Sequence, residues 1–162
     1  DNSSDEALLS EYGEKLKGLF KDTNINVISE PGRILVGRYG WLFSEVQYLK
    51  QTPYKNFIII NTGMHHLMRP CLYQAFHRVL PVVKGESSSC HLYDIVGPIC
   101  ESSDVIGHER LLPETKQGDH LVIADAGAYG AVMASTYNSH DLPKEFIYYQ
   151  GEVLDEKGER LI

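Results

Sequence analysis

Hydrophobic residues near the start of the chain recur at the spacing of a helix. The residues on this repeating face are Leu8, Leu9, Tyr12, Leu16, Leu19 and Phe20. The period predicts an amphipathic helix over residues 5–20, and Ser3 and Glu6 match a capping box at its start. Residues 25–29 are rich in β-branched side chains and predict a short strand that ends at Pro31-Gly32. A helix, a loop, a strand and a functional loop form the repeating unit of an α/β barrel, which one unit alone cannot close.

From Trp41 onward, short apolar runs separated by turn residues replace the helical pattern. Turn signals such as Thr52-Pro53 and Gly97-Pro98 divide these runs. Strands are expected at residues 41–50, 57–61, 79–84, 92–96, 120–124 and 145–149. Their spacing predicts an antiparallel barrel or sandwich. Residues 67–79 predict a short helix with Pro70 in its first turn.

Composition narrows the possible partners and compartments. The 162 residues suffice for one domain with a core, and the net charge of −7, without a basic stripe, argues against nucleic acid. No apolar run approaches the ~20 residues of a membrane helix, and the acidic start of the chain is unlike a signal peptide. Three cysteines, an odd and sparse number, favour a reducing cytoplasm. The adjacent His65-His66 point in different directions, so no metal site is expected.

The segment whose side chains are best suited to catalysis is residues 97–104, Gly-Pro-Ile-Cys-Glu-Ser-Ser-Asp. It places the thiol of Cys100 beside the carboxylate of Glu101, directly after a turn-forming Gly-Pro. A thiol with a tuned pKa exchanges a proton near neutral pH, and a carboxylate holds an ammonium group. The pair therefore suits chemistry on an amino acid with an extra amine. On composition alone, an ordinary turn with a buried cysteine is the competing interpretation.

Five motifs, in order between residues 25 and 145, resemble those of one enzyme family. Residues 97–104 are similar to the G-P-x-C-E-S-x-D signature of the diaminopimelate decarboxylases, which are pyridoxal-phosphate enzymes of the alanine-racemase-like fold type (fold type III). The other four are Glu30-Pro31-Gly32-Arg33 (E-P-G-R), Gly63-Met64 with Arg69-Pro70-Cys71-Leu72-Tyr73 (G-M-x-x-L-x-R-P-x-L-Y), Ala126-Gly127-Ala128-Tyr129-Gly130 (A-G-A-Y-G) and Tyr137-Asn138 (Y-N).

The resemblance covers only the C-terminal portion of such an enzyme. It implies that residues 1–33 are the end of the pyridoxal-phosphate-binding α/β (TIM) barrel. Residues 34–162 would then be a mainly β domain, a Greek-key antiparallel β-barrel like the C-terminal domain of alanine racemase. The Schiff-base lysine, the glycine-rich phosphate loop and a closing C-terminal segment match nothing here. Asp1 is therefore interpreted as a cleavage point or the edge of a gap, and this portion alone is expected to be inactive.

The resemblance also implies a cofactor site for pyridoxal 5'-phosphate. Glu30 would face the pyridine nitrogen and keep it protonated, which strengthens the ring as an electron sink. Gly32 would let the backbone approach the phosphate closely. Arg33 would lie at the cofactor and bind a substrate carboxylate, and Tyr129 would contact both the phosphate and the substrate. A plain Pro-Gly turn and a core tyrosine are the competing structural interpretations.

The remaining implied roles concern the substrate. Arg69 and Tyr73, four residues apart on one helix face, would grip its distal carboxylate together with Arg33. Cys100 would return a proton to the carbon that has lost carbon dioxide, and Glu101 would bind the ammonium group at the far end. In this family both reach across a homodimer interface into the partner's site.

The implied reaction is the conversion of meso-2,6-diaminopimelate to L-lysine and carbon dioxide, in lysine biosynthesis. Relatives acting on ornithine or arginine carry Asp after the cysteine, so Glu101-Ser102 favours diaminopimelate. A decarboxylase of another basic amino acid or polyamine precursor, or a non-catalytic regulatory subunit, remains an alternative. The sequence departs from the family at Asn61-Thr62, where Asp-Ala is more usual, and at His65-His66, which replaces the common Asn-Asp. Cys71 and Cys90 are interpreted as structural.

Overall fold

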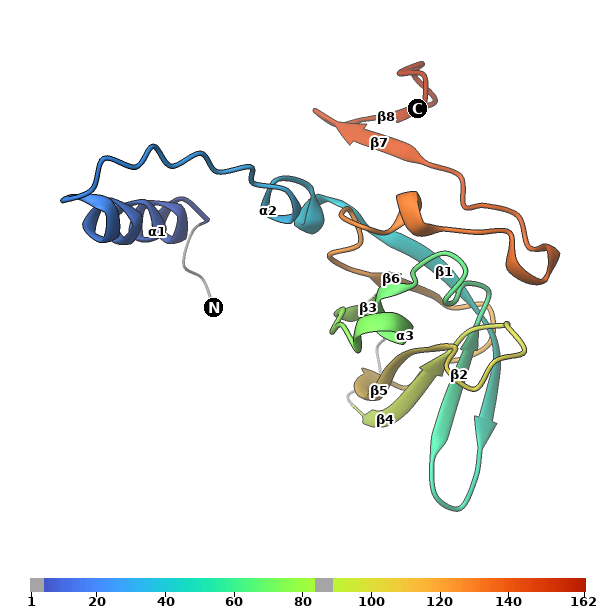
Figure 1. The fold of residues 1–162 in the computed structure, drawn as a ribbon. Helices are drawn as coiled ribbons and strands as arrows, with labels where there is room; N and C mark the ends of the chain where they lie inside the picture. Colours follow the sequence, from blue (N-terminus) through green and yellow to red (C-terminus); the bar gives the residue numbers. More distant parts are fainter. Residues whose placement is uncertain (1–4, 84–88) are drawn as a thin grey trace. The chain divides into compact units, whose positions relative to one another are not determined.

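The chain begins with the predicted helix, α1, which spans Asp5–Phe20 in the computed structural model (Figure 1). The structure describes residues 5–83 and 89–162, so the Ser3 end of the predicted capping box lies outside the described residues. Thr23 ends the helix, because its backbone N–H and its hydroxyl both donate to the carbonyl of Phe20, at 3.1 and 2.9 Å. The helix belongs to a first unit that ends at Pro31, and a second unit comprises Gly32–Ile162.

The strand predicted over residues 25–29 does not form. Residues 24–32 have no regular secondary structure, and side chains such as Ile28, 87% exposed, stay in solvent. A strand needs neighbouring strands to satisfy its backbone N–H and C=O groups. No strand of the described chain pairs with this segment, so its β-branched residues cannot become a strand here.

A six-stranded sheet forms the centre of the second unit. Its strands are β1 (Leu42–Gln51), β2 (Asn56–Ile60), β3 (Val79–Pro81), β4 (Cys90–Val96), β5 (Val105–Pro113) and β6 (His120–Ile123). They are ordered β3-β6-β1-β2-β4-β5, and all pairs are antiparallel except β2 with β4. The edge strands β3 and β5 lie close to each other, so the sheet nearly closes into a barrel. The predicted mainly β fold is confirmed.

The interior of this sheet holds the core. Inward-facing residues of several strands are fully or almost fully buried: Val46, Ile58, Ile60, Ile95, Ile106, Leu121 and Ile123. On β1 the buried Ser44 and Val46 are two residues apart, as the pleat of a strand requires. The alternation therefore turns one side of the sheet toward the core.

The six strands predicted from Trp41 onward are found, but two strands of the described chain, β5 and a later one, were missed. β5 has a polar middle, Gly-His-Glu-Arg at 107–110, and Glu109 has a φ of 50°, so its sequence lacks clean alternation. β8 (Glu152–Asp155) pairs only with β7 (Phe146–Tyr149) in a separate two-stranded sheet. Its turn, Gln150-Gly151, has positive φ at both residues, as a two-residue hairpin requires.

The helices of the second unit are short: α2 (Arg33–Val36), α3 (Arg69–Tyr73) and the 3₁₀ turns η1 (Gly37–Tyr39), η2 (Ala131–Met133) and η3 (Tyr137–Ser139). The helix predicted over residues 67–79 is therefore only α3. It stops because Gln74 takes a left-handed φ of 53° and the chain then turns His77 into the core, where its Nδ1 lies 2.9 Å from the Ala124 carbonyl oxygen. No helix in the described part of the chain is both long and apolar enough to cross a membrane.

Candidate active site

The loop between β4 and β5 carries residues 97–104, and the buried Asp104 holds it in place. This side chain is 2% exposed. Its Oδ1 accepts the backbone N–H of Met64 at 2.6 Å, and its Oδ2 accepts that of Ile99 at 2.8 Å. One carboxylate thus joins its own loop to the loop that follows β2. Asp104 closes the signature, yet no role was predicted for it from the sequence.

Two glycines make room for this carboxylate. A Cβ atom at Gly63 or at Gly97 would overlap the carboxylate oxygens of Asp104. Burial raises the pKa of Asp104, whereas the N–H donors of Met64 and Ile99 act in the opposite direction. The glycines that open the Gly-Met and Gly-Pro motifs are therefore needed where two loops pack around one acid.

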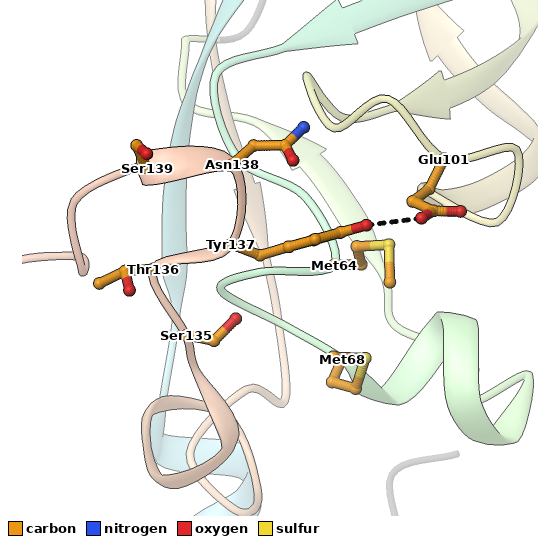
Figure 2. Close-up of a pocket in the computed structure, with 8 residues that line it drawn as sticks. All are labelled: Met64, Met68, Glu101, Ser135, Thr136, Tyr137, Asn138 and Ser139. Atoms are coloured by element: carbon orange, nitrogen blue, oxygen red, sulfur yellow. Dashed lines mark hydrogen bonds between the residues drawn. The ribbon is translucent and has the colours of Figure 1, made fainter.

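Cys100 and Glu101 are both exposed on this loop, which Asp104 holds in place. The competing interpretation of a buried cysteine is therefore wrong. Glu101 Oε1 accepts the phenol O–H of Tyr137 at 2.6 Å, and this hydrogen bond raises the pKa of Tyr137 (Figure 2). A depression beside the pair is lined by Met64, Met68, Glu101 and the turn at residues 135–139. The structure thus presents a free thiol and a hydrogen-bonded carboxylate next to each other on one loop.

Arg69 and Tyr73 are the first and last residues of α3. Their four-residue separation puts both on one face of the helix, as predicted. Within residues 5–83 and 89–162, neither side chain hydrogen-bonds to another residue, and no hydrogen bond or ion pair joins them to Cys100 or Glu101. The guanidinium and the phenol therefore remain able to bind a carboxylate.

Tyr129 and Gly32 come together at a second place in the unit. Tyr129 has a φ of 58° and is half exposed, and its hydroxyl lies 3.9 Å from where a Cβ of Gly32 would be. A small-residue turn presents it: a Cβ at Gly127 would overlap the carbonyl of Val36. The arrangement offers a phenol O–H beside open glycine backbone. Uncharged donors of this kind fit a phosphate group, so these residues are compatible with pyridoxal phosphate.

The other predicted cofactor residues lie close in sequence. Arg33 is exposed at the start of α2. Glu30 is exposed and belongs to the first unit. Four residues without a predicted role make specific contacts here. Asp104 and Tyr137 hydrogen-bond to the Cys100–Glu101 loop, and the histidine pair at 65–66 contacts the turn that carries Tyr137. The unusual His65-His66 pair was the one sequence signal for the last of these.

The chain is similar in sequence to known proteins of one family. The family described as "Pyridoxal-dependent decarboxylase, C-terminal sheet domain" matches residues 25–127. The diaminopimelate decarboxylase of Aquifex aeolicus is 38% identical over 143 residues, which are 88% of this chain and 34% of that protein. The enzyme of Bacteroides thetaiotaomicron is 48% identical over 117 residues, 72% of this chain and 30% of that protein.

Solved structures lead to the same family. Helicobacter pylori diaminopimelate decarboxylase in complex with L-lysine matches with a TM-score of 0.82 and 34% identity, over 94% of this chain and 37% of that chain. The chain thus spans about a third of the length of its relatives. The predicted resemblance to the diaminopimelate decarboxylases is confirmed, and the chain belongs to the pyridoxal-dependent decarboxylase family, of which it carries the C-terminal sheet domain.

Proposed function

We propose that the protein containing this chain is a diaminopimelate decarboxylase, which converts meso-2,6-diaminopimelate to L-lysine and carbon dioxide in lysine biosynthesis. The observation that carries this proposal is the pinned loop with Cys100 and Glu101 exposed, in a chain 38% identical to one such enzyme. The remaining two thirds, including the N-terminal barrel portion and its lysine, would belong to the same protein.

Cys100 supplies the proton in this proposal. Its thiol is free and exposed, so it can reach a substrate carbon outside its own loop. After the carbon–carbon bond to the carboxylate breaks and carbon dioxide leaves, the thiol proton is transferred to that carbon. Asp104 accepts the N–H of Ile99, which precedes the thiol, and that of Met64 in the neighbouring loop, which keeps the donor in position.

The far end of the substrate is bound by Glu101, Arg33, Arg69 and Tyr73. Glu101 binds its ammonium group, and the guanidinium groups with the Tyr73 phenol bind its carboxylate in charge-assisted hydrogen bonds. A substrate without that carboxylate leaves the arginines unpaired, so the site discriminates against it. The exposed guanidinium of Arg33 supports this assignment, as do the Arg69 and Tyr73 side chains, which have no hydrogen-bond partner among the described residues.

Glu30, Gly32, Arg33 and Tyr129 would hold pyridoxal 5'-phosphate, with Gly32 and Tyr129 at the phosphate. When bound, the cofactor supplies the electron sink that decarboxylation needs. The contact of the Tyr129 hydroxyl with the open side of Gly32 supports the phosphate assignment. Tyr129 also lies at the substrate in this arrangement.

The active protein would be a cytoplasmic homodimer whose active sites are shared. The Cys100 and Glu101 side chains are exposed at a loop tip, which supports their reaching into the partner's site. The three cysteines are free, which supports a reducing compartment.

The test is an assay of the full-length protein with meso-2,6-diaminopimelate. We expect absorbance from bound cofactor, release of carbon dioxide, and a loss of about 10²-fold or more in kcat for Cys100→Ala. Glu101→Ala should chiefly raise KM. Cys90→Ala, an exposed cysteine on β4, is the matched control. Turnover only of ornithine, arginine or a polyamine precursor would replace this proposal by the other decarboxylase, and absence of both cofactor and turnover would leave a regulatory subunit.

A further inference from the structure

The turn that carries Tyr137 has an unusual backbone. Asn138 and Ser139 have φ values of 55° and 61°, so two consecutive non-glycine residues are left-handed. Such residues are strained and persist where surrounding contacts hold them. The contacts around residues 135–141 therefore determine where the Tyr137 phenol lies.

Both ends of this turn are attached to the loop after β2. The Ser135 N–H donates to the His65 carbonyl at 2.8 Å, and His66 Nε2 lies 2.8 Å from the Asp141 carbonyl. Because a carbonyl only accepts, Nε2 of His66 carries a hydrogen, and Nδ1 accepts the hydroxyl of Thr62 at 2.7 Å. One imidazole thus joins the two loops.

Three adjacent imidazole rings, tilted by 45° and 43° against one another, complete the attachment. The His65 ring is fully buried, with its centroid 3.7 Å from that of His66 and 4.7 Å from that of His140. His140 lies on the Tyr137 turn, so the three rings span the junction between the two loops. We call His65, His66 and His140 the histidine clasp.

The loop after β2 therefore supports both partners of the hydrogen bond between Tyr137 and Glu101. Met64, adjacent to the clasp, donates its N–H to Asp104 and so secures the Cys100–Glu101 loop. The clasp secures the turn of Tyr137. The hydrogen bond from Tyr137 to Glu101 then joins two separately anchored segments (Figure 2).

We propose that Tyr137 is a positioning residue that fixes the Glu101 carboxylate for substrate binding, and that the histidine clasp holds Tyr137 in place. This inference deepens the proposed function and rests on it. The phenol occupies Oε1 of Glu101 and leaves Oε2 for the ammonium group of the substrate. A short hydrogen bond to a carboxylate is strong, so it restricts an otherwise exposed and flexible side chain.

The first test is Tyr137→Phe in the full-length enzyme, which removes only the hydroxyl. We expect KM for meso-2,6-diaminopimelate to rise about tenfold, with kcat within about twofold of the wild type, because the lost contact serves binding. Tyr54→Phe is the matched control, since Tyr54 is 93% exposed in the β1–β2 turn. An unchanged KM in Tyr137→Phe would overturn the proposal.

A double-mutant cycle separates positioning from a general structural role. In a Glu101→Ala background, which lacks the acceptor, Tyr137→Phe should change kcat/KM by less than about twofold, because the two residues act as one unit. His66→Phe keeps a ring against His65 but removes both nitrogens, so it should raise KM alone and add no further loss to Tyr137→Phe. Losses that simply multiply in both double variants would overturn the proposal.

A structural readout separates this proposal from the proposed function. If the wild-type enzyme releases no carbon dioxide from meso-2,6-diaminopimelate, the proposed function fails, and crystal structures of the wild type and Tyr137→Phe then decide the positioning role. A Glu101 carboxylate that leaves its wild-type orientation in the variant supports positioning. An unchanged orientation overturns it.

Discussion

At the scale of single residues, the candidate site depends on polar groups that are buried beneath it. Asp104 is almost fully buried, yet it holds the loop on which Cys100 and Glu101 are exposed. His65 is buried beneath the turn that carries Tyr137. The groups that touch substrate in our proposal therefore lie above others that only fix their positions.

Replacing Asp104 by Asn tests this support. One side-chain oxygen cannot serve both N–H groups, and the new amide would face a donor. We expect a loss of about 1–3 kcal/mol in the free energy of unfolding, together with lower kcat for the proposed reaction. Urea denaturation and steady-state kinetics of the full-length protein measure the two effects. Wild-type stability in this variant would contradict the role given to Asp104.

The buried imidazole predicts a dependence of stability on pH. Burial, together with the neighbouring His66 and His140, lowers the pKa of His65 from 6.5 to about 4. The unfolded chain binds this proton more readily, so stability is present above pH 6.5 and falls toward pH 4, by up to about 3 kcal/mol. The nearby Asp104 interacts with His66 and His140 and belongs to the same group of charges.

Substituting the ring separates this effect from general acid sensitivity. His65→Phe should reduce the fall in urea midpoint between pH 7 and pH 5, because phenylalanine takes up no proton. His120→Phe, at an exposed position on β6, is the matched control. An equal fall in wild type and His65→Phe would show that His65 does not contribute.

At the scale of elements, backbone conformation decides where segments end and how they meet. α3 ends at a left-handed Gln74, and the β7–β8 turn needs positive φ at Gln150 and Gly151. The segment at residues 25–29 has the composition of a strand, but no strand in the described part of the chain pairs with it. Strand composition is therefore sufficient only where neighbouring strands are present to form the backbone hydrogen bonds.

Two glycine-to-alanine substitutions should act in opposite directions. Gly13 lies inside α1 with nothing near its Cβ position, so Gly13→Ala should stabilise the helix by about 0.5–1 kcal/mol. Gly151 has a φ of 88°, so Gly151→Ala should destabilise the β7–β8 hairpin by about 1 kcal/mol. Amide hydrogen exchange should slow in α1 and accelerate in the hairpin. The same sign at both sites would contradict these conformations.

At the scale of the whole molecule, the chain spans about a third of the length of its relatives. It carries the proposed proton donor and substrate-binding groups, but no lysine in a motif that matches the Schiff-base residue. A protein of residues 1–162 alone should therefore neither retain pyridoxal phosphate absorbance after dialysis nor release carbon dioxide from meso-2,6-diaminopimelate. Turnover by this portion would show that a lysine within it serves the cofactor.

Short apolar runs between turn signals were enough to predict six strands and the mainly β fold, because the strands that pair with one another lie on this chain. The five sequence motifs were enough to identify the family and to select Cys100 and Glu101 as candidate site residues. The contacts of Asp104, the link from Tyr137 to Glu101 and the histidine clasp were beyond prediction, because each joins loops far apart in sequence, whose meeting depends on how the sheet closes. Local patterns therefore determined the elements and the family, and only the tertiary structure decided what holds the site together.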